Sequence, residues 1–212
     1  MHLNFLSHGP SLPRVIGFQF IQIIYWLALS TWFGSVIFIM LAAPTIFRTV
    51  RESNPVLTNV LSVNLEGQHA TLLAGSIVGN LLARLSIVQL SCAGVILICT
   101  ILQFFTADMQ GMNRWVAILR LVLCVAAAGV VAYDRFVIWP RITKSRTEYI
   151  DHADEPEVAN PAKDRFDAEH RRSMTLMMIT LGLLLLLIMY SANVQPAAPA
   201  GTAPAPAVEG AK

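Results

Sequence analysis

The sequence predicts an all-α integral membrane protein, built as a bundle of four transmembrane helices. Of its 212 residues, 55% are hydrophobic and 13% are charged, whereas soluble domains contain about 25% charged residues. Four continuous apolar runs reach the length of about 20 residues that a helix needs to cross the hydrocarbon core. Continuous runs favour helices over membrane barrel strands, in which apolar and polar residues alternate.

The first predicted span covers residues 15–43, with no charged residue between Arg14 and Arg48. This run is too long for the apolar part of a signal peptide, and Pro44 after the sequence LAA would obstruct cleavage, so we expect the span to be retained. The other spans are predicted at residues 85–105, 115–139 and 173–192. Residues 193–212 are rich in Pro and Ala and are predicted to form a disordered tail.

The positions of Lys and Arg predict the orientation, because these residues concentrate on the cytoplasmic side of a membrane. Connections 44–84 and 140–172, with the span ends that adjoin them, share one side. We expect that side to be cytoplasmic and both termini to be extracytoplasmic. It holds Arg48, Arg51, Arg84, Arg135, Arg141, Lys144, Arg146, Lys163, Arg165, Arg171 and Arg172, against Arg14, Arg114, Arg120 and Lys212 on the other side.

Helical signals extend into both cytoplasmic connections. Asn160 followed by Pro161 is a helix-start signal, so the fourth helix is predicted to begin in water near Asn160 and to enter the membrane near Ser173. Residues 71–84 are apolar enough for a helix and close with Arg84. They form either an interfacial elbow or an extension of one long second helix.

Several short motifs between about residues 18 and 192 resemble the transmembrane protein 205-like family, whose bacterial members form a domain of unknown function. The resemblance implies a four-helix protein of the bacterial inner membrane and brings no established catalytic residues. The acidic insert EYIDHADEPEVANPAKD has no counterpart in this pattern. The matching residues are Gly34, Ala43, Pro44 and Phe47, then Ala74, Gly75 and Gly79, then Pro140, Arg141, Phe166, His170 and Ser173.

Pro44 is predicted to stop or kink the first helix at the cytoplasmic surface, because it lacks one backbone donor. Phe47 and Arg48 then fit an interfacial anchor. The alternative is a broken helix whose freed carbonyl groups line a site. Small residues spaced four apart predict close helix contacts or, less simply, a dimer face. These pairs are Ser30 with Gly34 and Ala128 with Ala132.

Two ionisable residues lie inside the third span. Asp134 is predicted to pair with Arg84 or Arg48 on another helix and so to clamp the cytoplasmic end of the bundle. Arg120 lies about a turn and a half inside the span and is predicted to extend its side chain outward to the interface.

His170 is the most suggestive polar residue for a ligand site. Imidazole and thioether groups together suit a soft ion such as Cu(I), and His69 or Glu66 is placed to complete its coordination. The simpler interpretation is that methionines fill gaps in the bundle while His170 belongs to a surface network. Cys92, Cys99 and Cys124 are similarly interpreted as packing residues rather than a thiol relay. The residues that share the face of His170 are Phe166, Met174, Met177 and Met178.

The expected function is that of a non-enzymatic accessory, stress-related or scaffold protein without cofactors, because the sequence shows no acid–base pair or nucleophile motif. A net charge of +2 with dispersed basic residues disfavours nucleic acid as a partner. The lipid bilayer is the expected partner, with a homo-oligomer or a second membrane protein left open. The alternative is a transporter or handler of a small solute or soft metal ion around His170, Met174 and Pro44.

Overall fold

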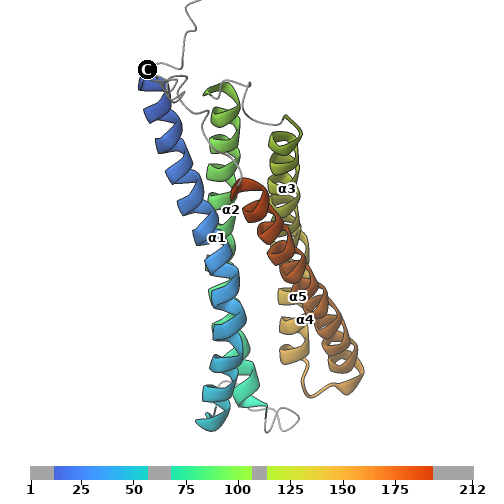
Figure 1. Cartoon of the computed structure of the whole chain (residues 1–212). Helices are drawn as coiled ribbons and strands as arrows, with labels where there is room; N and C mark the ends of the chain where they lie inside the picture. The colour runs from blue at the N-terminus through green and yellow to red at the C-terminus, as the bar shows by residue number, and fades with distance from the viewer. Residues whose placement is uncertain (1–11, 57–67, 107–113, 193–212) are drawn as a thin grey trace, which may run out of the picture.

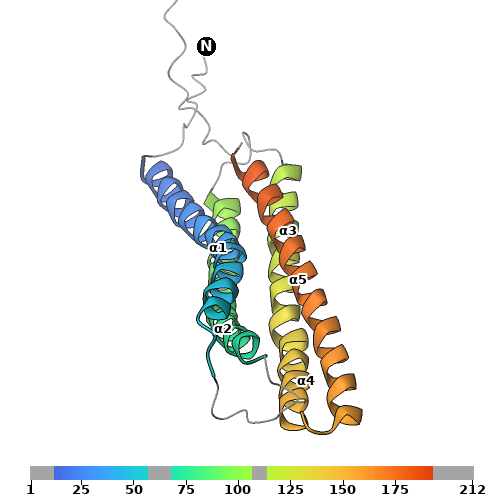
Figure 2. The same ribbon diagram turned by 90° about the horizontal axis from the view of Figure 1, so that it is seen from below.

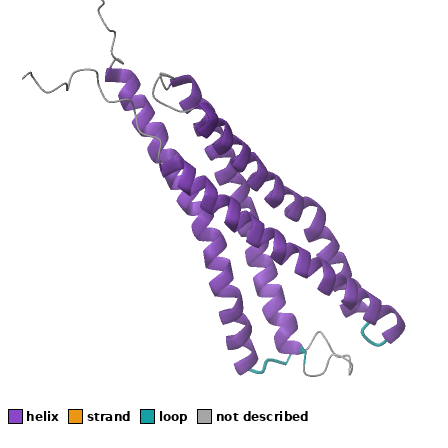
Figure 3. Cartoon of the chain, turned by 45° about the vertical axis from the view of Figure 1, so that its right-hand side comes forward, coloured by secondary structure: helices purple, strands orange, loops and turns teal. Residues whose placement is uncertain are grey.

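The computed structural model describes residues 12–56, 68–106 and 114–192, and every regular element in these ranges is helical (Figures 1 and 3). The predicted all-α fold class is confirmed, and four helical stretches are long and apolar enough to cross a membrane. The predicted disordered tail lies outside the described residues. The elements are α1 (Leu12–Glu52), α2 (His69–Thr106), α3 (Arg114–Tyr133), the π-helix η2 (Asp134–Ile138), α4 (Trp139–Asp151) and α5 (Pro156–Ala192).

The helices form two pairs. α1 lies beside α2, while α5 lies beside the nearly continuous rod of α3, η2 and α4 (Figures 1 and 2). The pairs diverge toward one end, here called the turn end, which contains Glu52, His69 and the turn between α4 and α5. The opposite end, here called the terminal end, contains Leu12, Thr106, Arg114 and Ala192.

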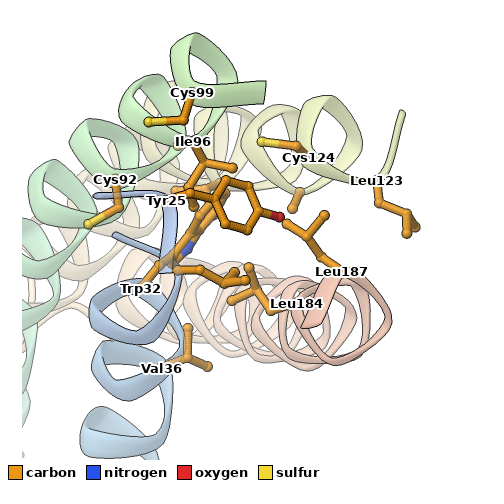
Figure 4. Packing of buried hydrophobic residues seen from close by; sticks show 14 residues of the cluster. Tyr25, Trp32, Val36, Cys92, Ile96, Cys99, Leu123, Cys124, Leu184 and Leu187 are labelled. Carbon is orange, nitrogen blue, oxygen red and sulfur yellow. The ribbon is translucent and has the colours of Figure 1, made fainter. Parts of the chain in front are cut away.

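The core lies between the pairs and draws side chains from all four predicted spans (Figure 4). On α1 the buried residues Tyr25, Leu29, Trp32 and Val36 are spaced by three or four and so share one face. The outer faces carry exposed large apolar side chains, such as Phe38 and Leu41. An apolar outer surface is what lipid tails require. Cys92, Cys99 and Cys124 are buried and free, as their interpretation as packing residues expects.

Pro44 does not stop the first helix, which was one of the two effects predicted for it, because α1 continues through it to Glu52. A proline removes one backbone hydrogen bond from a helix, and neighbouring hydroxyl groups often compensate for that loss in membranes. The carbonyl that Pro44 leaves without its helical donor is that of Met40, and the Thr45 hydroxyl donates instead to the next carbonyl oxygen, that of Leu41, at 2.9 Å. Extensive packing of α1 against α2 supports the continued helix.

Helix α5 begins at Pro156, so the predicted start near Asn160 was wrong and Pro161 lies inside the helix. The Glu155 carbonyl accepts the N–H groups of Val158 and Ala159 and starts the first turn. Ala159 and Ala162 are buried, and small side chains here let α5 pack closely on α4. Residues 71–84 belong to the single long α2, which decides between the two interpretations of that segment.

Candidate functional site

A cavity of about 60 Å³ lies between the two helix pairs, on the turn-end side of the core. Apolar side chains such as Val36, Ile39 and Met177 form much of its wall. Its polar lining comes from three different stretches of the chain. These residues are Ser86 and Gln89 from α2, Asp134 and Arg135 from η2, and Ser173 and Thr180 from α5.

Asp134 begins the π-helix, and Pro140 explains why the helix widens there. Proline has no N–H for the carbonyl four residues back, and its ring would collide with that carbonyl. The chain inserts a wide turn just before the proline, in which the Trp139 N–H donates to the Asp134 carbonyl oxygen five residues earlier. Wide turns of this type occur frequently at functional sites. Here the turn places Asp134 and Arg135 together in the cavity wall.

The Asp134 carboxyl group is only partly satisfied by its surroundings. The Ser173 side chain from α5 lies beside it. Its Oδ1 atom is buried and has no hydrogen-bond partner among the described residues. A buried acceptor without a partner costs free energy, typically about 1–3 kcal/mol and more when it is charged. Asp134 is therefore the polar group in this cavity that a ligand would satisfy.

Two long side chains of the rod, Trp139 and Arg146, reach α2 beside this region. A Cβ atom on Gly79 would lie 3.4 Å from Trp139 Cη2, in van der Waals contact, so a side chain larger than alanine would displace the indole ring. The Arg146 guanidinium crosses Gly75 and donates to the Leu72 carbonyl oxygen at 2.8 Å and to Ser76 Oγ at 2.7 Å. The Ala-Gly motif therefore lies where these long α4 side chains contact α2.

A second polar cluster, the Arg120 cluster, closes the terminal end of the bundle. Arg120 is 1% exposed, so the predicted outward extension of its side chain was wrong. Its guanidinium donates to Gln103 Oε1 and Ser191 Oγ, both at 3.1 Å, and lies 4.7 Å from the centre of the Tyr25 ring. Gln103 in turn donates to Gln22 Oε1 at 2.7 Å. Neutral partners from three other helices therefore hold the guanidinium inside the bundle.

The predicted pairing of Asp134 with Arg84 or Arg48 was wrong. Arg48 instead pairs with Glu52 at 2.9 Å, and both side chains are exposed. Arg84 is also exposed. No ion pair of Asp134 occurs within the part of the chain that the structure describes. The pair does not form because the widened turn directs the Asp134 side chain toward α5, whereas the Arg84 side chain lies on the outer face of α2.

Gly34 is not a packing notch within this chain, because it is exposed and an added Cβ atom would meet nothing within 4 Å. Ser30 on the same face is also exposed. The predicted close contact at this pair is therefore absent within the described chain. Phe47 is half-buried and Pro44 is exposed, beyond the cavity lining on α1.

The structure does not bring together the residues of the ligand site that was predicted around His170. His170 is exposed and stacks on Phe166, with ring centres 5.8 Å apart. Met174 also points outward, while its neighbour on α5, Met177, lines the cavity. His69 is half-buried at the start of α2. Within the described ranges, no three His, Cys, Asp or Glu residues are grouped to hold a metal ion. Glu66 lies outside those ranges.

Two other predicted site residues lie on α4. Arg141 lies 3.9 Å from a Glu169 oxygen, and Pro140 is exposed. The sequence analysis singled out Asp134 and Ser173 individually but did not predict that they line the same cavity. It missed Gln89 and Thr180. Polar residues inside apolar spans were the available signal for both, because such residues usually face the bundle interior or a cavity.

Comparison with known families gives one match. A family model described as a domain of unknown function, DUF4149, matches residues 27–150, which is more than half of the chain. No curated protein and no solved structure matches the chain. The matched range contains Arg120, Asp134 and Trp139 but stops before Ser173. This chain belongs to the DUF4149 family.

Proposed function

We propose that this chain is a non-enzymatic, four-span protein of the bacterial inner membrane that binds and handles a small polar solute in the cavity around Asp134. The observation that carries the proposal is the buried Oδ1 atom of Asp134, which lines the cavity side of the bundle and has no hydrogen-bond partner among the described residues. Ionisable residues inside membrane spans are costly and usually serve substrate or ion pathways. We also propose that the chain is related to the transmembrane protein 205-like family.

The proposal places solute entry on the cytoplasmic side. The excess of Lys and Arg supports a cytoplasmic turn end and extracytoplasmic termini. The cavity lies on that side of the core, while the Arg120 cluster ties the helices together at the terminal end. Reporter fusions at both termini and at Glu155, in the turn between α4 and α5, test the orientation. An active cytoplasmic reporter at residue 212 would contradict it.

Two neighbouring methionines on α5 offer a matched test of the cavity. Met177 lines it, whereas Met178 is 53% exposed on the outer face. Each is replaced by cysteine in a chain whose buried Cys92, Cys99 and Cys124 are alanine. Only water-exposed thiolate reacts readily, so we expect silver ion, a hydrophilic thiol reagent of a single atom, to block position 177 at least about tenfold faster than position 178. The thiol that remains is counted with maleimide after denaturation.

The reagent is applied to inside-out membrane vesicles, and Ser53→Cys, exposed beyond the end of α1, supplies the rate for open water. If water fills the cavity as proposed, the labelling rate at position 177 should lie between the rates at positions 53 and 178. Equal slow labelling at 177 and 178 would show that water does not reach the cavity and would overturn the proposed function.

A scaffold or accessory role is the second candidate, and the α4–α5 hairpin favours it. The two helices continue past the predicted membrane surface and are joined by ion pairs, including Arg165 with Glu148 at 3.0 Å. Such a stiff, charged arm suits docking of another protein. A photo-crosslinking residue at exposed Lys163 should then give one discrete adduct in cells, and a smear or no adduct would count against this role.

A further inference from the structure

The hydroxyl groups in the cavity wall present acceptors rather than donors. Thr180 Oγ1 donates to the Leu176 carbonyl oxygen at 2.9 Å, and Ser86 Oγ donates to the Ala83 carbonyl oxygen at 2.9 Å. A hydroxyl has one proton and two lone pairs, so each oxygen keeps its acceptor capacity after this bond. With the buried Oδ1 of Asp134, three acceptors from three helical elements line one cavity.

The charge in the wall is not neutralised by contact. Arg135 also lines the cavity, yet the ion pairs within 4.0 Å among the described residues do not include Asp134 or Arg135. An ionised carboxylate accepts only, so its natural ligand is a cation or a strong donor. Trp139 adds an indole ring to the lining, and aromatic rings attract ammonium-type cations.

Size and polarity narrow the ligand further. A cavity of about 60 Å³ holds a ligand of only a few heavy atoms. Divalent metal ions of the hard class take six or more oxygen ligands, whereas much of this wall is apolar, including Leu176 and Met177. A small alkyl group fits beside such side chains, while N–H donors fit the acceptors.

We propose that the Asp134 cavity binds a small ammonium-type cation, of the size of ammonium or methylammonium, with Asp134 as its counter-charge and Thr180 and Ser86 as acceptors. This inference rests on the proposed function and gives its solute a chemical class. The Trp139 ring lies against the cation, and Met177 against its alkyl group.

Radiolabelled methylammonium is the probe, measured by scintillation proximity on the purified full chain in detergent. We expect saturable binding of about one methylammonium per chain and displacement by unlabelled ammonium. Asp134→Asn should weaken binding at least about tenfold, because it removes a charged acceptor. Tetramethylammonium should not compete, since it is larger and has no N–H donor.

Thr180→Val tests recognition without a change of charge. It removes one acceptor and should weaken binding about fivefold. Thr175→Val is the matched control, because Thr175 makes the same type of bond, to the Arg171 carbonyl oxygen at 3.0 Å, but is exposed on the outside of α5. It should leave binding unchanged. This pair keeps the test decisive if Asp134→Asn does not fold.

The outcomes separate this inference from the proposed function. Absence of methylammonium binding, competition by tetramethylammonium, displacement by sodium but not by ammonium, or equal effects of Thr180→Val and Thr175→Val would each overturn the ammonium-type ligand. If position 177 is still labelled from water, the solute-binding cavity stands and only its ligand class is wrong. If position 177 is not labelled, both proposals fail.

Discussion

Replacing Gln103 by leucine should be among the most damaging single changes in the bundle. Gln103 accepts from the Arg120 guanidinium at 3.1 Å and donates to Gln22 at 2.7 Å, and it is 1% exposed. A bond to a charged group contributes about 1.5–3 kcal/mol and a neutral one about 1 kcal/mol. Hydrogen bonds between membrane helices average about 0.6 kcal/mol, because the unfolded state finds partners too. We expect a loss of about 2 kcal/mol in unfolding free energy.

The assay is SDS-induced unfolding in mixed micelles, followed by far-ultraviolet circular dichroism. Gln19→Leu is the control, because Gln19 is exposed on α1. Arg120→Met alone should cost less than Gln103→Leu, since it removes the buried charge itself and leaves only neutral groups. Of these, Gln103 keeps its bond to Gln22 and Ser191 keeps its bond to the Leu187 carbonyl oxygen. The double variant should then be more stable than Gln103→Leu alone, with a coupling energy of at least about 1 kcal/mol. Additive effects, or equal losses in Gln103→Leu and Gln19→Leu, would refute the reasoning.

Three further changes are measured in the same unfolding assay. Tyr25→Phe removes the 2.6 Å hydrogen bond to Ser191 but keeps the ring near Arg120, so it should cost about 1 kcal/mol, whereas exposed Tyr190→Phe should cost nothing measurable. Gly79→Leu should cost about 1–3 kcal/mol by displacing Trp139, while Gly34→Leu, with open space around it, should be tolerated; equal losses would contradict this account of Gly79. Glu52→Gln breaks an exposed ion pair and should change stability by less than about 0.5 kcal/mol; a larger loss would mean that the pair is not screened by solvent.

The fold class could be predicted because length and continuity of apolar runs are local properties of the sequence. Helix ends were harder, as Pro44 shows. A proline signal competes with packing along the rest of the helix, and α1, which continues through Pro44, packs extensively against α2. The same competition moved the start of α5 from Asn160 to Pro156, where Ala159 and Ala162 add buried contacts with α4.

The candidate site was only partly predictable, because it depends on how the helices face one another. Asp134 was singled out as an ionisable residue inside a span, but its partner was wrong. Pro140 was identified as the end of the third span. It also widens the helical turn that precedes it, and this effect could not be predicted from a spacing of 3.6 residues per turn. Arg120 was expected outside because long cations often extend to the interface, whereas Gln103 and Ser191 hold it inside.

The central claim is that a small cation occupies the cavity beside Asp134, and protection of a cavity thiol from labelling tests it most directly. The chain carries Met177→Cys with the three native cysteines replaced by alanine, and the labelling of this thiol by silver ion is followed with and without methylammonium. The account predicts severalfold slower labelling when methylammonium is present and no such protection when Asp134→Asn is added. Equal labelling rates with and without methylammonium in the chain that retains Asp134 would contradict the claim.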